Sequence, residues 1–364
     1  MTKRKLRSNF EPGTPRWAVR RAQWKALGLS DADLEKPKIA IVNTSSELSS
    51  CFSHLDGVAA RVKQAIRATG GVPFEVRTAA PSDFITSAGR QGRYILPSRD
   101  LLVNDIEVQV EGAQLDGMVC LASCDKTGPG QLMAAARLDI PSIIVACGYQ
   151  PHGHLHGRAI DIEEVYESVG KVRAAQITVE ELQAMCDVAI QGPGVCAGMG
   201  TANTMHIAAE ALGLALPGST PVSANSERMF AFAEAAGRRI VEMIDEDLRP
   251  SRILTAEAFE NAIASVQNSD VKRFDEILAA DFYCSNPDKS LIDRAAFLQQ
   301  TAKPVAIMNL RAEDVKIRIL APRPTTGLTA ETMPAEIEAL RQVYEHELAQ
   351  MRADRKNAAI GLAS

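Results

Sequence analysis

The sequence lacks the long apolar runs and the apolar leader of membrane and exported proteins. No segment of its 364 residues approaches the roughly 18 consecutive apolar residues of a membrane-spanning helix. The basic N-terminus, MTKRKLRSNF, runs into EPGTPRW without an apolar stretch, so we interpret it as a solvated tail and not as a secretory signal. The alternative is an arm for oligomer contacts or phosphate binding. We therefore expect a cytoplasmic protein with no membrane partner.

An excess of positive charge is also missing. The formal net charge is -5 at pH 7, which gives no general attraction to nucleic acid. We expect no nucleic-acid partner and a small-molecule substrate instead. The hydrophobic content of 46% is enough for a large core, and the length predicts two domains or one domain with an appendage.

Closely spaced cysteine pairs of the kind that bind zinc are absent. The chain has seven cysteines but no C-x-x-C spacing, so a metal site would have to be assembled from distant loops. The odd count and the lack of an export signal indicate a reducing compartment, where thiols pack, bind metal or react. Cys120 and Cys147 fall within apolar runs and are candidates for the core.

From about residue 38 the chain alternates strand-like and helix-like segments. The expected strands are short apolar runs, and the expected helices carry apolar residues at helical spacing. This order predicts an α/β fold, a parallel sheet flanked by helices. The expected strands are residues 38–44, 72–78, 116–122 and 141–147, and the expected helices are residues 56–70, 98–113, 130–140 and 201–212, with two more between 161 and 190.

Three polar segments follow these strands. SSELSSC comes after the first strand, SCDKTGPG after the third and CGYQPHGH after the fourth. Ligands of parallel sheets bind at the carboxyl ends of the strands, so a site is expected there. A fourth segment, QGPGVCAGMG, crowds glycines around a cysteine before a helix, and its free N–H groups could face an anion or a cluster.

Three cysteines lie in these segments: Cys51, Cys124 and Cys196. Three converging thiolates can hold an iron–sulfur cluster and leave one iron without a protein ligand. Such an iron is a Lewis acid that can take a hydroxyl group from a substrate. The alternative is that they are small buried thiols, which is common for free cysteines.

Several oxygen and nitrogen donors accompany the cysteines. Asp125 could bind a hard divalent cation, and a neutral Lys126 could act as a base or bind CO2 as a carbamate; the alternative is a surface ion pair. Asp83 is either another ligand or a turn residue. Five histidines are less informative, and we interpret them as loop or loop-orienting residues: His54, His152, His154, His156 and His206.

Two long stretches resemble one family. GMVCLASCDKTGPGQLMAAARLDIPSIIV and GPGVCAGMGTANTMHIAAEALGLALPGST are similar to the paired signatures of the dihydroxy-acid and sugar-acid dehydratases, and NTSSELSSCFSHL and QGRYILPSRD fit the same family. The resemblance covers residues 5–263. It implies a role in branched-chain amino acid biosynthesis or sugar-acid metabolism, and a homodimer.

The resemblance also implies a metal site. The cysteines at 51, 124 and 196 would hold a cluster of the three-cysteine, [2Fe-2S] type. Asp83 and Asp125 match magnesium ligands, and Lys126 matches the lysine that is carbamylated to supply another and to take part in catalysis. Phe84 follows Asp83 where the family usually has glycine. The implied reaction is dehydration of a 2,3-dihydroxy carboxylate to a 2-keto acid.

The resemblance ends before the last hundred residues. We expect an N-terminal arm at residues 1–34, a dehydratase-like α/β domain at 35–263, a segment at 265–320 similar to SnoaL-like (NTF2-like) folds, and a linker and helix at 321–364. The family's C-terminal domain supplies a glutamate ligand and a serine base that have no counterpart here. Two hypotheses remain: an active dehydratase completed by other segments or a partner chain, or a catalytically incomplete cluster-binding protein.

Overall fold

The computed structural model describes residues 5–79, 82–86, 89–198 and 200–267, together with residues 283–285, 291–293 and 295. All of them belong to one unit of the chain, Met1–Ile319. The predictions for residues 321–364, and most of those for 265–320, lie outside the described residues. No helix in the described part of the chain is long and apolar enough to cross a membrane.

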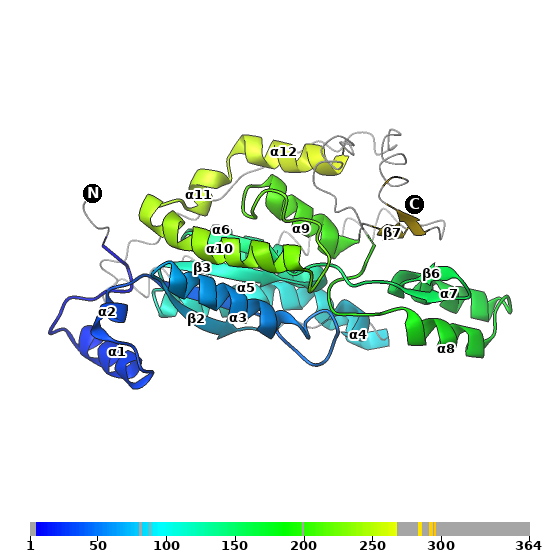
Figure 1. The fold of residues 1–364 in the computed structure, drawn as a ribbon, viewed down its shortest axis with the longest axis horizontal. Coiled ribbons are helices and arrows are strands. Elements are labelled where there is room, and N and C mark those ends of the chain that lie inside the picture. Colours follow the sequence, from blue (N-terminus) through cyan, green and yellow to red (C-terminus); the bar gives the residue numbers. More distant parts are fainter. Residues whose placement is uncertain are drawn as a thin grey trace, which may run out of the picture. The chain divides into compact units, whose positions relative to one another are not determined.

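A four-stranded parallel sheet forms the centre of the fold (Figure 1). Its order is β2-β1-β3-β4, so β1 and β3 are flanked by strands on both sides. Each strand agrees with its predicted range to within one residue at either end, which confirms the α/β prediction. The strands are β1 (Lys38–Asn43), β2 (Val72–Arg77), β3 (Gly117–Ala122) and β4 (Ser142–Ala146).

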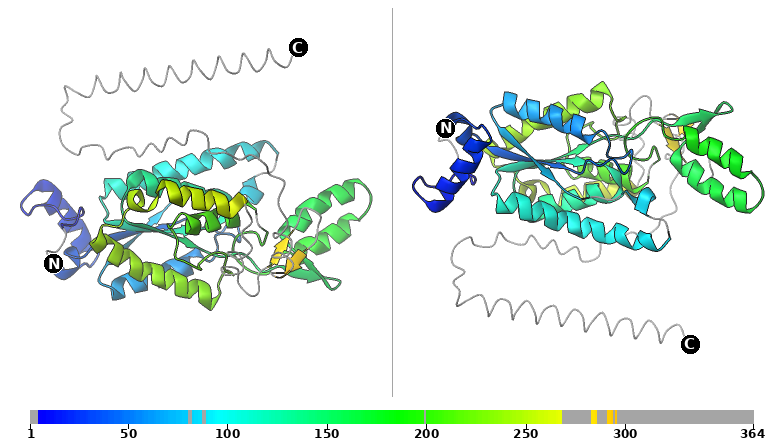
Figure 2. Two further views of the ribbon diagram at one scale, coloured as in Figure 1. Left: turned by 90° about the horizontal axis from the view of Figure 1, so that it is seen from above. Right: turned by 90° about the horizontal axis from the view of Figure 1, so that it is seen from below.

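Helices cover both faces of the sheet (Figure 2). One face packs against α3 (Leu55–Ala68) and α10 (Glu227–Glu246), and the other against α5 (Ile95–Gly112), α6 (Cys124–Leu138) and α9 (Thr201–Ala211). Alternate residues of a strand face opposite sides, so Ile41 joins the first core and Val42 the second.

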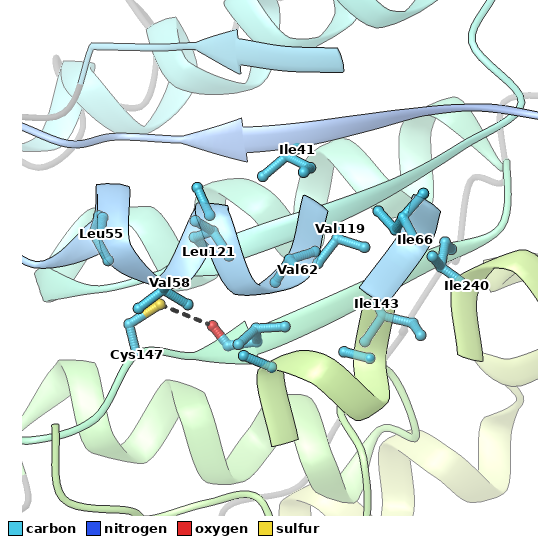
Figure 3. Close-up of a cluster of buried hydrophobic side chains, with 14 of the residues drawn as sticks. Ile41, Leu55, Val58, Val62, Ile66, Val119, Leu121, Ile143, Cys147 and Ile240 are labelled. Carbon is cyan, nitrogen blue, oxygen red and sulfur yellow. Dashed lines mark hydrogen bonds between the residues drawn. The ribbon is translucent and has the colours of Figure 1, made fainter. Parts of the chain in front are cut away.

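The first core is built from aliphatic side chains of α3, α10 and the strands (Figure 3). Ile41, Leu55 and Ile66 are completely buried in it, and each such side chain stabilises the fold by about 1.5–3 kcal/mol relative to an exposed position. Helices α3 and α10 approach closely at Gly237, where a Cβ atom would lie 2.8 Å from both the Val62 carbonyl oxygen and the Ala65 Cβ. A side chain at this position would push the two helices apart.

Helix α6 begins six residues earlier than predicted, at Cys124 instead of Gly130. The sequence G-P-G is typical of a turn, yet Pro129 lies inside the helix. Proline removes one backbone hydrogen bond, which a helix tolerates best near its N-terminus, where N–H groups lack intrahelical partners. Asp125 and Lys126 therefore lie on the first turn of a helix and not on a loop.

The remaining elements flank the sheet at its two ends (Figure 1). The N-terminal arm is held by Asp116, whose carboxylate accepts hydrogen bonds from the backbone N–H of Ser8 (3.0 Å) and of Lys38 (2.8 Å).

Beyond the carboxyl ends of the strands, a hairpin and two helices form a small layer with a core of its own. Thr178 caps the second helix by accepting from the Glu181 N–H at 3.1 Å. The arm contains α1 (Pro15–Ala26) and α2 (Asp31–Leu34); the small layer contains β5 (Gly153–Leu155), β6 (Arg158–Ile160), α7 (Ile162–Arg173) and α8 (Val179–Val188).

Short elements complete the described part. Two of them precede α5, two follow α10, and the last two pair as an antiparallel hairpin that lies within the predicted SnoaL-like segment. The resemblance of that segment to a SnoaL-like fold stays a prediction. These elements are α4 (Asp83–Thr86), η1 (Gly89–Tyr94), α11 (Pro250–Ile253), α12 (Ala256–Gln267), β7 (Tyr283–Ser285) and β8 (Leu291–Asp293).

Candidate metal centre

Two of the predicted cysteine ligands meet at the carboxyl edge of the sheet. Cys51 lies in the turn between β1 and α3, and Cys124 begins α6 directly after β3. The buried hydroxyl of Ser123 donates to the Cys51 carbonyl oxygen at 2.5 Å and fixes the two segments together. The thiols of Cys51 and Cys124 hydrogen-bond to each other. Residues 73 positions apart in the chain are thus brought into contact.

The backbone of Cys124 has an uncommon conformation. Its φ is +61°, in the left-handed region that few non-glycine residues adopt. Such a conformation costs about 1–3 kcal/mol and persists where the surroundings enforce it, typically at functional sites. Here the preceding Ser123 is extended, and its N–H donates to the Thr127 hydroxyl at 3.0 Å. The turn from β3 into α6 therefore directs the Cys124 thiol into the site.

Asp83 joins the two cysteines from a third segment. The Cys124 sulfur lies 3.3 Å from Asp83 Oδ1 and donates to it. Since a thiol has one hydrogen, the Cys124 S–H is shared between the Cys51 sulfur and the Asp83 carboxylate. Asp83 begins the short helix α4, and the next residue, Phe84, packs edge-on against Tyr166 of α7, with ring centroids 6.2 Å apart.

Cys196 lies in the glycine-rich loop between α8 and α9, and backbone hydrogen bonds hold that loop against the others. The N–H of Gly194 donates to the Ser50 carbonyl oxygen at 3.2 Å, next to Cys51. Gly194 has a φ of +121°, and a Cβ atom there would lie 2.8 Å from the Gly148 carbonyl oxygen, so only glycine fits. Asn203 Nδ2 donates to the Cys196 carbonyl oxygen at 2.9 Å.

The three thiols differ in acidity. The hydrogen bond from Cys124 lowers the pKa of Cys51 to about 7, whereas the same bond, together with burial, raises the pKa of Cys124. Burial also raises the pKa of Cys196, and nearby negative groups act in the same direction. The thiolate is the form that binds metal, so Cys51 is the most readily available of the three ligands.

Asp125 and Lys126 form an ion pair with each other. Their side chains are only 14% and 15% exposed, so this is not the solvated surface pair that we weighed as an alternative. The structure therefore brings Asp125 and Lys126 together on one helical turn, while Asp83 is bonded to Cys124. No three His, Cys, Asp or Glu side chains within the described ranges form a group that could hold a single metal ion.

One carboxylate that sequence reasoning missed lies against the Cys196 loop. The Glu163 oxygens lie 2.5 and 2.6 Å from the position that a Cβ atom of Gly198 would occupy. Burial raises the pKa of Glu163 to about 7, with further contributions from Asp161 and Glu167. Acidic residues in the first turn of a helix are common because they interact favourably with the helix dipole. The sequence pattern around Glu163 therefore did not indicate this contact.

The histidines contribute to loop structure. His54 Nε2 lies 2.7 Å from the Cys147 carbonyl oxygen and links the Cys51 segment to the end of β4. His206 is buried and bonds to the backbone of Ala122, just before Ser123. His154 lies in β5, with its ring 5.1 Å from that of His152. The first two histidines therefore hold the strand ends that carry the cysteines.

Sequence comparison relates the chain to one family of known proteins. A sequence model of the family described as "Dihydroxy-acid/6-phosphogluconate dehydratase N-terminal" matches residues 36–269. The dihydroxy-acid dehydratase of Pyrococcus abyssi is 44% identical over 247 residues, which is 68% of this chain and 45% of that protein. Those of Methanococcoides burtonii and Metallosphaera sedula are each 43% identical, over 70% and 73% of this chain and 46% and 48% of theirs. The chain spans about half the length of these curated relatives. It belongs to the dihydroxy-acid/6-phosphogluconate dehydratase family and contains that family's N-terminal domain.

Proposed function

We propose that this chain is the metal-binding part of a hydro-lyase that dehydrates a 2,3-dihydroxy or sugar carboxylate to a 2-keto acid. The observation that carries the proposal is the junction of three cysteine segments at one edge of the sheet. Ser123 bonds to Cys51, Gly194 bonds to Ser50, and the Cys124 thiol bonds to Asp83. Side chains that only filled a core would not require three separate loops to be tied together in this way.

The cysteines fit an iron–sulfur cluster. Sulfur is a soft donor that suits iron, and the proposed ligands are Cys51, Cys124 and Cys196. A cluster distributes its ligands over more than one iron, so the three sulfurs need not converge on a single point. Two of the thiols are buried, which protects a bound cluster from water and oxidants. When bound, the cluster supplies a Lewis-acidic iron for departure of the C3 hydroxyl group.

The carboxylates fit magnesium by their chemistry. Hard oxygen donors suit this ion, and the proposed ligands are Asp83, Asp125 and a carbamylated Lys126. In the structure both carboxylates are engaged, Asp83 with the Cys124 thiol and Asp125 with the Lys126 ammonium. Lys126 can react with CO2 only as the neutral amine, so its pairing with Asp125 has to open before the carbamate forms. When bound, the ion would hold the substrate's carboxylate and C2 hydroxyl group.

The residues of the chain have defined tasks in this proposal. The bonds of Ser123 and Asn203 position the cysteine segments, and burial of Cys51 and Cys124 excludes water. The Lys126 ammonium would release two protons from Nζ, one to become the neutral amine and one as the new C–N bond to CO2 forms the carbamate. The free thiols require a reducing compartment such as the cytoplasm, and the expected assembly is a homodimer.

A second candidate function has an observation in its favour. The chain matches 45% and 46% of two relatives, and the resemblance assigns a glutamate ligand and the proton-abstracting serine to the part of those proteins that it does not match. The second candidate is a chain that holds cluster and magnesium without turnover. The loss of a general base alone removes about two to four orders of magnitude in rate.

One experiment separates the two functions. The chain is reconstituted anaerobically with iron, sulfide and magnesium, and then assayed with 2,3-dihydroxyisovalerate and with aldonic acids. Keto acid formation supports the dehydratase, and a visible cluster without product supports the alternative.

A matched pair of variants tests the cluster ligands. Cys124→Ala should abolish the cluster, whereas Cys120→Ala, in the core of β3, should leave it intact. Equal cluster content in both variants would contradict the assignment.

A further inference from the structure

Helix α7 contacts two of the segments that carry proposed metal ligands. Its residue Glu163 lies against Gly198 in the Cys196 loop, and its residue Tyr166 packs edge-on against Phe84, next to Asp83. These contacts lie within one helical turn of each other. The small layer beyond the strand ends therefore borders the site directly and is more than a peripheral appendage.

The Glu163 side chain fills the space that a side chain at position 198 would take. All three atoms closest to a Cβ atom at Gly198 belong to the Glu163 carboxyl group, at 2.5, 2.6 and 2.7 Å. The same carboxyl group is 3.6 Å from the corresponding position at Gly200. The absence of side chains at these glycines therefore allows an acidic group to approach the backbone of the cysteine loop.

No positive group in the described part of the chain offsets this carboxylate. The charged groups that affect the pKa of Glu163 are Asp161 and Glu167, and both are acidic. Asp161 is only 2% exposed and is fixed as the cap of α7, where Oδ1 accepts from the Glu164 N–H at 2.9 Å. The nearby Arg158 pairs with Glu164. Above about pH 7, where Glu163 is ionised, its negative charge consequently acts on its surroundings without compensation, and Cys196 is among the groups that it affects.

We propose that Glu163 is a positioning residue of the cluster: its carboxylate braces the Cys196 loop and places a negative charge that lowers the reduction potential. This inference rests on the proposed function, because it requires a cluster on Cys196. A negative charge near a cluster disfavours the added electron, and net charge is among the factors that set cluster potentials. Asn203, which bonds to the carbonyls of Cys196 and Gly198, braces the same loop without adding charge.

The electrostatic part is tested by two charge-matched variants of the full chain. At a pH well above 7, where Glu163 is ionised, Glu163→Gln and Glu167→Gln each remove one negative charge from the same face of α7, one turn apart, and of these two residues only Glu163 acts on Cys196. Spectroelectrochemical titration of the reconstituted protein should give a higher potential for Glu163→Gln than for Glu167→Gln. Glu163→Asp, which keeps the charge, should stay closer to the wild type. Equal potentials in the two glutamine variants would overturn the inference.

The packing part is tested by a compensating pair. Gly198→Ala should take up less cluster than the unsubstituted chain, because the new methyl group displaces the flexible Glu163 side chain from the loop. The same substitution in a Glu163→Ala background should have little further effect, since the obstructing atoms are gone. Additive losses would overturn the bracing role. A wild-type chain that takes up no cluster would refute the proposed function as well, whereas a cluster that is indifferent to Glu163 refutes only this inference.

Discussion

The hydroxyl of Ser123 is expected to be the main clamp between the first two cysteine segments. Ser123 is fully buried, and its Oγ donates to the Cys51 carbonyl oxygen at 2.5 Å. In Ser123→Ala this carbonyl loses its donor in a site closed to water, which costs about 1–3 kcal/mol. Ser123 makes no side-chain cap bond to α6, so no capping contribution of about 1 kcal/mol adds to the loss. Its backbone bond to Thr127 is unaffected by the substitution.

Urea unfolding of the metal-free chain measures this cost as a lower midpoint at an unchanged slope. Ser53→Ala is the matched control, because the exposed Ser53 hydroxyl donates to a carbonyl of the same loop at 3.3 Å. Its loss should change the free energy of unfolding by less than about 0.5 kcal/mol. A second readout is thiolate ultraviolet absorbance. Cys51 should ionise with a pKa of about 7 in the wild type and nearer its ordinary value of 9.0 in Ser123→Ala, since the thiols separate. If both serine variants unfold at the same urea concentration, Ser123 is not the clamp.

Two further predictions concern stability. Burial lowers the pKa of His206 from 6.5 to about 4, so between these pH values the unfolded chain binds a proton that the folded chain does not. Stability present above pH 6.5 should therefore be lost as the pH falls from 6.5 to 4, by up to about 3 kcal/mol. Urea unfolding across this range should be less pH-dependent in His206→Asn, and an equal dependence would contradict the assignment. Gly237→Ala should destabilise the chain by about 1–3 kcal/mol through overpacking of α3 on α10. Gly170→Ala, at an open helical position, should instead stabilise it by about 0.5–1 kcal/mol in the same thermal unfolding experiment, and equal shifts would refute the packing argument.

The sheet could be predicted from the sequence because three of its four strands are buried along their whole length, on both faces. Residues of β3 from Gly117 to Ala122 are all buried, and so are those of β1 and β4. Such strands read as continuous apolar runs bounded by polar turns, and the intervening helices then require a parallel order. The same topology places the ends of β1 and β3 at one edge of the sheet, so the segments of Cys51 and Cys124 could be expected near each other, whereas the contact of the two thiols could not.

Sequence patterns gave a wrong or no prediction where contacts between distant segments determine the backbone conformation. The G-P-G sequence favours a turn, yet the hydrogen bonds of Ser123 and Thr127 start helix α6 upstream of it. The place of Glu163 could not be predicted at all, because no spacing rule links a residue on α7 to a glycine 35 positions later. Its contact exists because the loop before α9 is pinned to the ends of β1 and β4, which only the folded chain defines.

The bonds that hold the two proposed magnesium carboxylates imply an order of events in the proposed site. Asp83 is held by the Cys124 thiol, and Asp125 by the Lys126 ammonium. A thiolate cannot donate a hydrogen bond, so loss of the Cys124 proton on metal binding replaces this bond to Asp83 by repulsion. Carbamylation of Lys126 likewise removes the cation that pairs with Asp125. Each change on a neighbour therefore removes one competitor of magnesium for a carboxylate, so cluster binding should raise the affinity for magnesium. Because such coupling is reciprocal, magnesium should strengthen cluster binding by the same factor.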